Sequence, residues 1–212
     1  MKEIKNLKKN SSVTERDYSL NKPLLIIGII CILSAIFLWI NNIYVSNTAD
    51  MSSQIISSKL DSRISKKRRN IHDVSKLNGI EMPSLNIDGD RYIGEIFIKK
   101  LNKKLPIMKN LDYDKLKLSP CRYSGSVFDK NLIIGGHNFR GHFGKISTLK
   151  NGDKIEIIDV DGNTYNYFVD KIEVINQSKL DLLTNNNDNW DLSLFTCTLS
   201  GNSRYVVRCK FY

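Results

Sequence analysis

The sequence predicts a mainly β-structured (all-β class) domain that is tethered to a membrane by one helix. Three observations support this: an uncharged apolar run near the N-terminus, short β-rich segments separated by turn residues from position 91 onward, and reactive side chains at the ends of those segments. Many short strands with long connections are typical of a small β-barrel or sandwich. At 212 residues, one domain with accessory segments is expected.

The apolar run covers residues 23–40, which are 18 residues without a charge. A transmembrane helix needs about 17–25 such residues, and Trp39 and Tyr44 lie where an interfacial aromatic belt would form. The alternative is a cleaved signal peptide, whose apolar core is normally about 7–15 residues long and precedes an Ala-x-Ala-like site. Asn41 and Asn42 follow this run instead. We therefore expect an uncleaved anchor.

Residues 1–22 form a polar, basic tail in which we expect no regular structure. The tail carries six Lys or Arg residues against three acidic ones. By the positive-inside rule, such a tail stays in the cytoplasm and the C-terminal part of the chain lies outside the cell. A second basic cluster at 63–69 lies more than 20 residues beyond the run, where its influence on orientation is weak.

The formal net charge of +10 suits an anionic partner, either lipid headgroups or a cell-wall polyanion. The alternative is that the basic run is a solvated helix face. A nucleic-acid partner is disfavoured because the basic domain would lie outside the cell. Three of the four cysteines would also lie outside, so at least one thiol is left unpaired. No pair of cysteines has CxxC or zinc-ligand spacing, and we expect no metal or other cofactor.

Residues 41–90 are expected to form an extracellular helical stalk and a linker. Apolar residues recur on one helical face, which predicts a helix over about 50–77; they are Ile56, Leu60, Ile64, Ile71 and Val74. Asn78-Gly79 is a natural helix stop. Pro83 then opens an extended linker.

From residue 91 the pattern changes to short segments rich in Ile, Val, Tyr and Phe. The predicted strands are 92–98, 132–135, 154–160, 164–175, 192–197 and 204–212. Asp161-Gly162-Asn163 predicts a hairpin turn between two of them. Short helical segments fit only near 144–150 and 180–185.

Three residues of complementary chemistry lie at predicted strand ends. Cys197 ends one strand, Arg204 begins the last strand, and His137 follows the segment 132–135. A thiol of ordinary pKa, about 8.5, is only a few per cent thiolate at neutral pH. His137 would be the cationic neighbour of the thiolate and its proton partner, and the planar fork of Arg204 suits a carbonyl oxygen or an oxyanion. We predict Cys197 as nucleophile, His137 as acid–base partner and Arg204 as clamp.

Alternatives to these assignments exist. Cys197 could be a buried apolar residue or half of a disulfide with Cys209. Strand alternation argues against the disulfide, because Cys209 and Arg204 fall on opposite faces of the last strand and Cys209 then points into the core. His142 competes with His137, but it does not follow a strand directly and we expect it on a loop surface. His72 is expected to be solvated in the stalk.

These residues resemble the signature of sortases, which are membrane-anchored cysteine transpeptidases of Gram-positive bacteria with an eight-stranded β-barrel. In that family a strand ends in T-L-x-T-C and an arginine follows on the next strand; here the residues are 193–197, reading SLFTC, and Arg204. The family's histidine stands in a Gly-His pair, here Gly136-His137. The segment 92–98 followed by Leu105-Pro106-Ile107 also fits, so the resemblance covers about residues 90–212.

The resemblance implies that 91–212 is a sortase-like eight-stranded β-barrel with short helices. Cys197 would cleave an LPxTG-like motif near the C-terminus of a secreted protein, between Thr and Gly. The resulting thioester would pass to an amine of cell-wall peptidoglycan, with hydrolysis by water as a side reaction. The family places its arginine at the start of the final strand, which favours Arg204 over Arg208. Cys121 stands in a predicted loop where many relatives have glycine, which could reshape the pocket mouth.

Two alternative functions are kept. Pilin-polymerising sortases often carry an Asp-Pro-aromatic lid motif before the barrel, and this sequence has none, so an anchoring role is preferred. A non-catalytic, membrane-tethered β-domain that binds wall polymer would explain the charge and the anchor. It would leave unexplained why Cys197, His137 and Arg204 all lie at strand ends.

Overall fold

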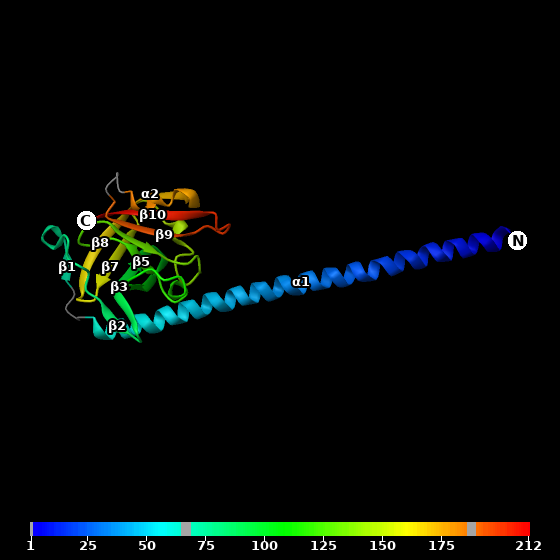
Figure 1. Ribbon diagram of the computed structural model, residues 1–212, viewed down its shortest axis with the longest axis horizontal. Coiled ribbons are helices and arrows are strands. Elements are labelled where there is room, and N and C mark those ends of the chain that lie inside the picture. Colours follow the sequence, from blue (N-terminus) through cyan, green and yellow to red (C-terminus); the bar gives the residue numbers. More distant parts are fainter. Residues whose placement is uncertain (1, 65–68, 186–189) are drawn as a thin grey trace. The chain divides into compact units, whose positions relative to one another are not determined.

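The computed structural model describes residues 2–64, 69–185 and 190–212, with side chains from residue 22 onward in these ranges. The chain separates into two compact units, Met1–Val45 and Ser46–Tyr212. The long helix α1 (Lys2–Arg63) supplies the first unit and the start of the second (Figure 1). Pro23 lies inside this helix.

The first unit carries the apolar run. Among the described residues, one helix, Lys22–Arg63, is long and apolar enough to cross a membrane, with a mean hydropathy of 2.8 over its most apolar 18 residues and none of that window buried. Exposing such side chains to water costs about 25 cal/mol per Å² of apolar surface, so the run suits a lipid environment. The basic tail was expected to lack regular structure, but the helix begins at Lys2. Lys and Glu, frequent in the tail, are good helix formers.

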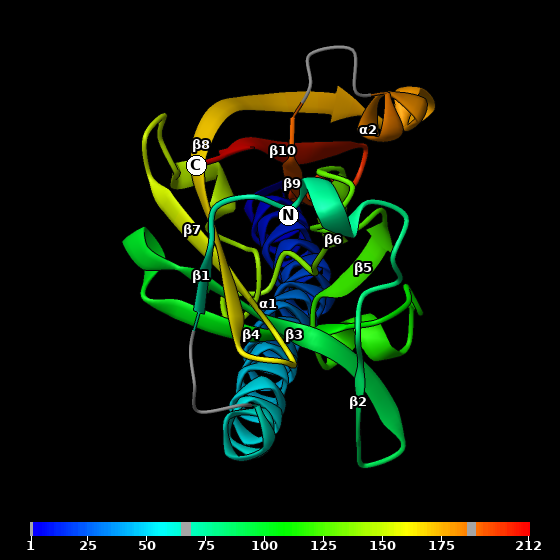
Figure 2. The same ribbon diagram turned by 90° about the vertical axis from the view of Figure 1, so that its left-hand side faces the viewer.

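Eight strands of the second unit close into a barrel, as expected, and Figures 1 and 2 show their arrangement. They are β3 (Asp90–Ile98), β4 (Lys103–Met108), β5 (Cys121–Ser124), β6 (Leu132–Gly135), β7 (Lys154–Asp159), β8 (Asn163–Asn176), β9 (Leu192–Cys197) and β10 (Ser203–Phe211). The pairing order is β8-β10-β9-β6-β5-β4-β3, and β7 closes the ring because it pairs with both β3 and β8. Two short strands lie outside the ring: β1 (Arg69–Ile71) pairs with β8, and β2 (Leu85–Ile87) pairs with β3.

All six predicted strands are present, with ends within two residues of those expected. The predicted turn at 161–163 joins β7 to β8 as an antiparallel hairpin, with Gly162 at φ +82°. The two predicted helical segments correspond to a 3-10 turn at Ile146–Thr148 and to α2 (Asp181–Thr184). Figure 2 shows α2 beside the end of β8.

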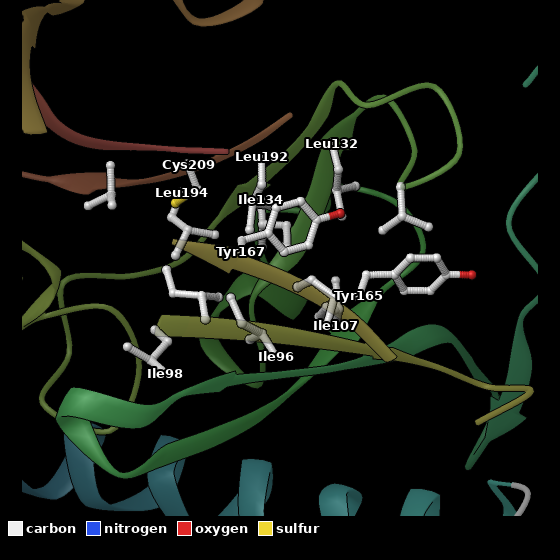
Figure 3. Packing of buried hydrophobic residues seen from close by; sticks show 14 of the residues in the cluster. Ile96, Ile98, Ile107, Leu132, Ile134, Tyr165, Tyr167, Leu192, Leu194 and Cys209 are labelled. Carbon is white, nitrogen blue, oxygen red and sulfur yellow. The ribbon is translucent and has the colours of Figure 1, made fainter. Parts of the chain in front are cut away.

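The barrel interior is filled by alternate residues of the strands, as shown in Figure 3. Ile96, Ile134 and Leu194 are fully buried there, together with the aromatic ring of Tyr167. Cys209 belongs to the same cluster and is a free thiol, so the expectation that it is a core residue is confirmed. Period-two alternation therefore decides which face of each strand packs.

A helix was predicted over about 50–77, but α1 ends at Arg63. The second half of that prediction is therefore wrong. Ile71 lies in β1, which pairs in parallel with β8, and Val74 is buried in the main core. The basic cluster that separates them from α1 falls partly on 65–68, outside the described residues. The seven-residue gap between Ile64 and Ile71 fits a helical face, but strand pairing and core burial are stronger than that weak periodicity.

The C-terminal turns of α1 pack against the barrel within the second unit. Leu60 and Ile64 are buried in a second apolar cluster with Tyr92, Met108 and Ile158. The Lys104 ammonium group forms ion pairs with Asp61 of α1 and with Glu95, a buried residue of β3. Burial raises the pKa of Glu95, although Lys104 opposes that rise.

Candidate active site

The hairpin of β9 and β10 brings two of the predicted site residues together. Arg204 and Cys197 are directly opposite partners in the antiparallel ladder. β6 runs parallel to β9 on its other side, with Gly135 opposite Phe195, and the Gly136 N–H donates to the Phe195 carbonyl at 3.0 Å. The strand pairing thus delivers His137, just after β6, to the same end of β9 as Cys197.

The three predicted residues line one cavity of about 120 Å³. Its walls are largely apolar and include Leu180, Leu183, Tyr123 and Phe195. The rings of Tyr123 and Phe195 make an edge-to-face contact, with 5.5 Å between their centroids. A larger cavity of about 370 Å³ contains none of the three residues. We take the smaller cavity as the candidate site because it holds a thiol, an imidazole and a guanidinium group together.

His137 is half-buried, and burial lowers its pKa, as does the positive charge of Lys117. Both effects favour the neutral form of the ring. Its Nε2 is buried and has no hydrogen-bond partner in the described part of the chain. The Phe139 ring stacks on it with 4.6 Å between centroids. A neutral imidazole with an unengaged nitrogen can accept a proton from a thiol.

Arg204 turns its side chain toward the hairpin loop. Its Nη1 donates to the carbonyls of Gly201 at 2.9 Å and Ser203 at 3.0 Å. These bonds fix the guanidinium plane at the cavity edge beside Cys197. Among the described residues, the other guanidinium nitrogens of Arg204 make no hydrogen bond, so they can bind a carbonyl oxygen.

Arg208 lies on the same face of β10 as Arg204, but it has another role. Its side chain is only 3% exposed and pairs with Glu173 at 2.9 Å. It also donates to the carbonyls of Leu182 and Leu183 in α2 and to the Ser193 hydroxyl. Arg208 therefore holds α2 against the barrel, and α2 supplies the cavity wall through Leu183. An arginine in the middle of an apolar strand was the sequence signal for this role.

His142 was expected on a loop surface, and this is wrong. It is 1% exposed, and its Nε2 lies 3.0 Å from the hydroxyl of Ser53 on α1. Burial lowers its pKa to about 4, although the Ala49 backbone favours the protonated ring. His142 does not line the cavity that holds Cys197. His72 is exposed, as expected, though it follows β1 and does not lie in a helix.

The four cysteines are all free thiols. Cys121 was expected in a loop at the pocket mouth, but it lies in β5 and is buried in the second apolar cluster. Burial raises the pKa of Cys121 to about 11 and also raises that of Cys209. Within the described residues of the second unit, Cys197 alone is a partly exposed thiol.

Comparison with known proteins identifies the family. The family model of the sortase domain matches residues 96–212, more than half of the chain. Sortase D of Bacillus subtilis (strain 168) is 26% identical over 125 residues, which are 55% of this chain and 62% of that protein. The match thus spans less than two thirds of that relative.

Two solved structures share the fold. A Clostridium perfringens sortase D5 transpeptidase has 23% identity and a TM-score of 0.54, covering 78% of this chain and 99% of that one. Clostridium perfringens sortase C, solved with the C-terminal cell wall sorting motif, has 24% identity and a TM-score of 0.51, covering 64% of this chain and 75% of that one. The matched residues 96–212 hold all but the first residues of the barrel, with the cavity's cysteine, histidine and arginine, and the chain belongs to the sortase family.

Proposed function

We propose that this chain is a membrane-tethered cysteine transpeptidase that cleaves a sorting motif in secreted proteins. The observation that carries the proposal is that Cys197, His137 and Arg204 line one small cavity. A thiol nucleophile, a proton acceptor and a fixed cationic fork are the groups that acyl transfer requires. Family membership supports the same reaction class.

The proposed reaction has two balanced halves. The Cys197 sulfur attacks the Thr carbonyl carbon of the motif while its proton passes to His137, and Arg204 binds the oxyanion. The C–N bond then breaks, and His137 protonates the departing glycine amine, which leaves a thioester. An acceptor amine attacks the thioester, gives its proton to His137, and the C–S bond breaks as Cys197 recovers that proton.

The cavity walls favour an apolar peptide. Leu180, Leu183 and Phe195 present aliphatic and aromatic surface beside the thiol, which suits the Leu and Pro of an LPxTG-like motif. The sortase C structure with a C-terminal cell wall sorting motif provides a precedent within this fold. A peptidoglycan amine is the proposed acceptor. If the acceptor were instead a lysine amine of another secreted subunit, the enzyme would be a pilin polymerase. The anchoring and the pilin-polymerising reactions differ only in this acceptor amine.

The proposed organisation places the chain across the cell membrane. Residues 1–22 would be a cytoplasmic tail, 23–40 the single span, 41–90 a stalk and linker, and 91–212 the extracellular catalytic barrel. The apolar, unburied helix supports the span, and the basic tail supports its direction. Protease added to cells without walls should then remove the barrel and spare the tail; protection of the barrel with loss of the tail would reverse the orientation.

The function is tested with the full chain in detergent micelles and a library of labelled sorting-motif peptides. We expect cleavage of at least one motif and an enzyme–peptide adduct in intact mass spectra, with both lost in Cys197→Ala. Folded wild-type protein that forms no adduct with any motif but retains wall polymer would instead support the wall-binding alternative.

A further inference from the structure

Within the second unit, Asp50 and Ser53 of α1 contact the loop that carries His137. We name residues 137–144, between β6 and the next 3-10 turn, the histidine loop. Two contacts join the helix and this loop: a hydrogen bond between Ser53 and His142, and a close approach of Asp50 to Gly141. Neither His142 nor Ser53 lines the cavity that holds Cys197.

The hydrogen bond has a defined direction. The single hydroxyl proton of Ser53 is donated to the Leu118 carbonyl at 2.8 Å, so toward His142 the Ser53 oxygen accepts. His142 therefore carries its proton on Nε2, 3.0 Å from that oxygen. The groups facing His142 are Asp50, Lys103 and His137. Burial, Lys103 and His137 all lower the pKa of His142 and favour the neutral ring, whereas Asp50 favours the protonated ring. Ser53 is 0% exposed and His142 1%, so losing either partner strands a buried polar atom.

Hydrogen bonds and ring contacts join the residues of the histidine loop to one another. Its backbone turns are closed by bonds from the Phe143 N–H to the His137 carbonyl at 3.1 Å and from the His142 N–H to the Phe139 carbonyl at 3.0 Å. The Phe139 ring lies beside both imidazoles, 4.6 Å from the His137 centroid and 5.8 Å from that of His142. A shift of His142 is therefore passed through Phe139 to His137.

The helix and the loop approach as closely as their backbones allow. A Cβ atom on Gly141 would lie 2.7 Å from the Asp50 Cβ and 3.0 Å from its Cα. Asp50 cannot turn aside, because these are atoms at the backbone, and its carboxylate pairs with Lys103 of β4 at 3.0 Å. Any larger residue at 141 would push the loop away from the helix.

We propose that Ser53 and His142 are positioning residues that hold His137 in register with Cys197. The proposal rests on the proposed function of His137 as the proton partner. The helical segment that supplies Ser53 follows the apolar run in the sequence. The position of the His137 imidazole would therefore depend on the part of the chain directly after the membrane anchor. A displacement of about 1 Å at a catalytic group can cost up to about 100-fold in rate.

The test uses full-length protein in micelles, in a Cys31→Ala background so that Cys197 supplies the fast thiol reaction. Ser53→Ala removes the acceptor, and Gly141→Ala inserts a wedge while keeping every hydrogen-bonding group. His142→Gln keeps a nitrogen donor at the Nε2 position, whereas His142→Phe removes it. Ser58→Ala is the matched control, because Ser58 is on the same helix but is exposed and bonds only to its own helix, at Ile55.

Three readouts are compared: the ring titration of His137 by NMR of labelled histidine, the pH profile of Cys197 alkylation, and peptide cleavage. We expect Ser53→Ala, Gly141→Ala and His142→Phe to shift the first two and to lower kcat on the order of 10-fold to 100-fold, with KM within about 3-fold. His142→Gln should stay within about 3-fold of wild type in kcat, and Ser58→Ala should match wild type throughout.

If Ser53→Ala and Gly141→Ala lower only the melting temperature, or if His142→Gln is as impaired as His142→Phe, the positioning role is refuted. Failure of wild-type protein to cleave any sorting peptide would refute the proposed function. The titration and alkylation readouts would still decide whether the helix sets His137, so the two failures are distinguishable.

Discussion

Replacing Arg208, on the outer face of β10, by alanine should destabilise the fold. Arg208 is 3% exposed and donates to Glu173, to Ser193 and to two carbonyls of α2. Breaking a buried ion pair by removing one partner costs about 3–5 kcal/mol. In Arg208→Ala, the Glu173 side chain, which is 22% exposed, still has its ion pair with Lys171 at 3.0 Å. We therefore expect a loss of unfolding free energy at the lower end of that range, about 3 kcal/mol.

The loss is measured as a thermal shift of the full chain in micelles. For a domain of about 150–250 residues, 1 kcal/mol corresponds to about 2–4 °C, so Arg208→Ala should melt about 6–12 °C below wild type. Lys171→Ala is the control: Lys171 pairs with the same carboxylate but is half-exposed, and such pairs contribute about 1 kcal/mol or less. Equal, small shifts for both variants would contradict the assignment of Arg208 as the support of α2.

The remaining predictions concern the site itself. Cys197→Ala should abolish cleavage and adduct formation, and His137→Ala should lose at least about 100-fold in kcat, both by peptide assay; full activity of either variant would remove that residue from the mechanism. Arg204→Ala should cost about 2.7–4 kcal/mol in transition-state stabilisation, and Arg204→Lys should stay impaired because it lacks the planar fork; normal turnover in steady-state kinetics contradicts this. Because burial lowers the pKa of His142 to about 4 from its ordinary 6.5, the unfolded chain binds a proton first as pH falls, so melting temperature should drop between about pH 6.5 and 4. His142→Gln should flatten that drop, and an unchanged slope would show that the ring titrates normally.

Local sequence patterns predicted six of the eight barrel strands and three residues that line one cavity. The six predicted strands combine β-branched or aromatic residues with turn signals, and period-two alternation alone predicts that Cys209 faces the core. β4 and β5 were not predicted as separate strands. β4 contains Pro106, and β5 is only four residues long with two polar side chains. Both depend on barrel closure more than on their own propensity.

Features that depend on distant contacts could not be predicted. The burial of His142 requires α1 to pack against a loop 89 residues further along the chain, and nothing around His142 in the sequence indicates that contact. The helix end at Arg63 was missed for a similar reason, because Ile71 fits a helical face until it pairs with β8. Arg204 was preferred to Arg208 because the family has its arginine at the start of the final strand. The partners of Arg208, which come from β8, β9 and α2, could not be predicted from the sequence.

The placement of the site follows from the two faces of the β9–β10 hairpin. Leu192, Leu194, Val207 and Cys209 fill the barrel interior. The alternate residues face outward, where Ser193 binds Arg208 and Val206 packs with Leu183 of α2. Cys197 and Arg204 continue this outer face at the loop end of the hairpin, outside the main core cluster. Their side chains are thus available for chemistry while the opposite face of the same strands stabilises the barrel. On the outer face, Val206 and Arg208 hold α2, which supplies the cavity wall through Leu183.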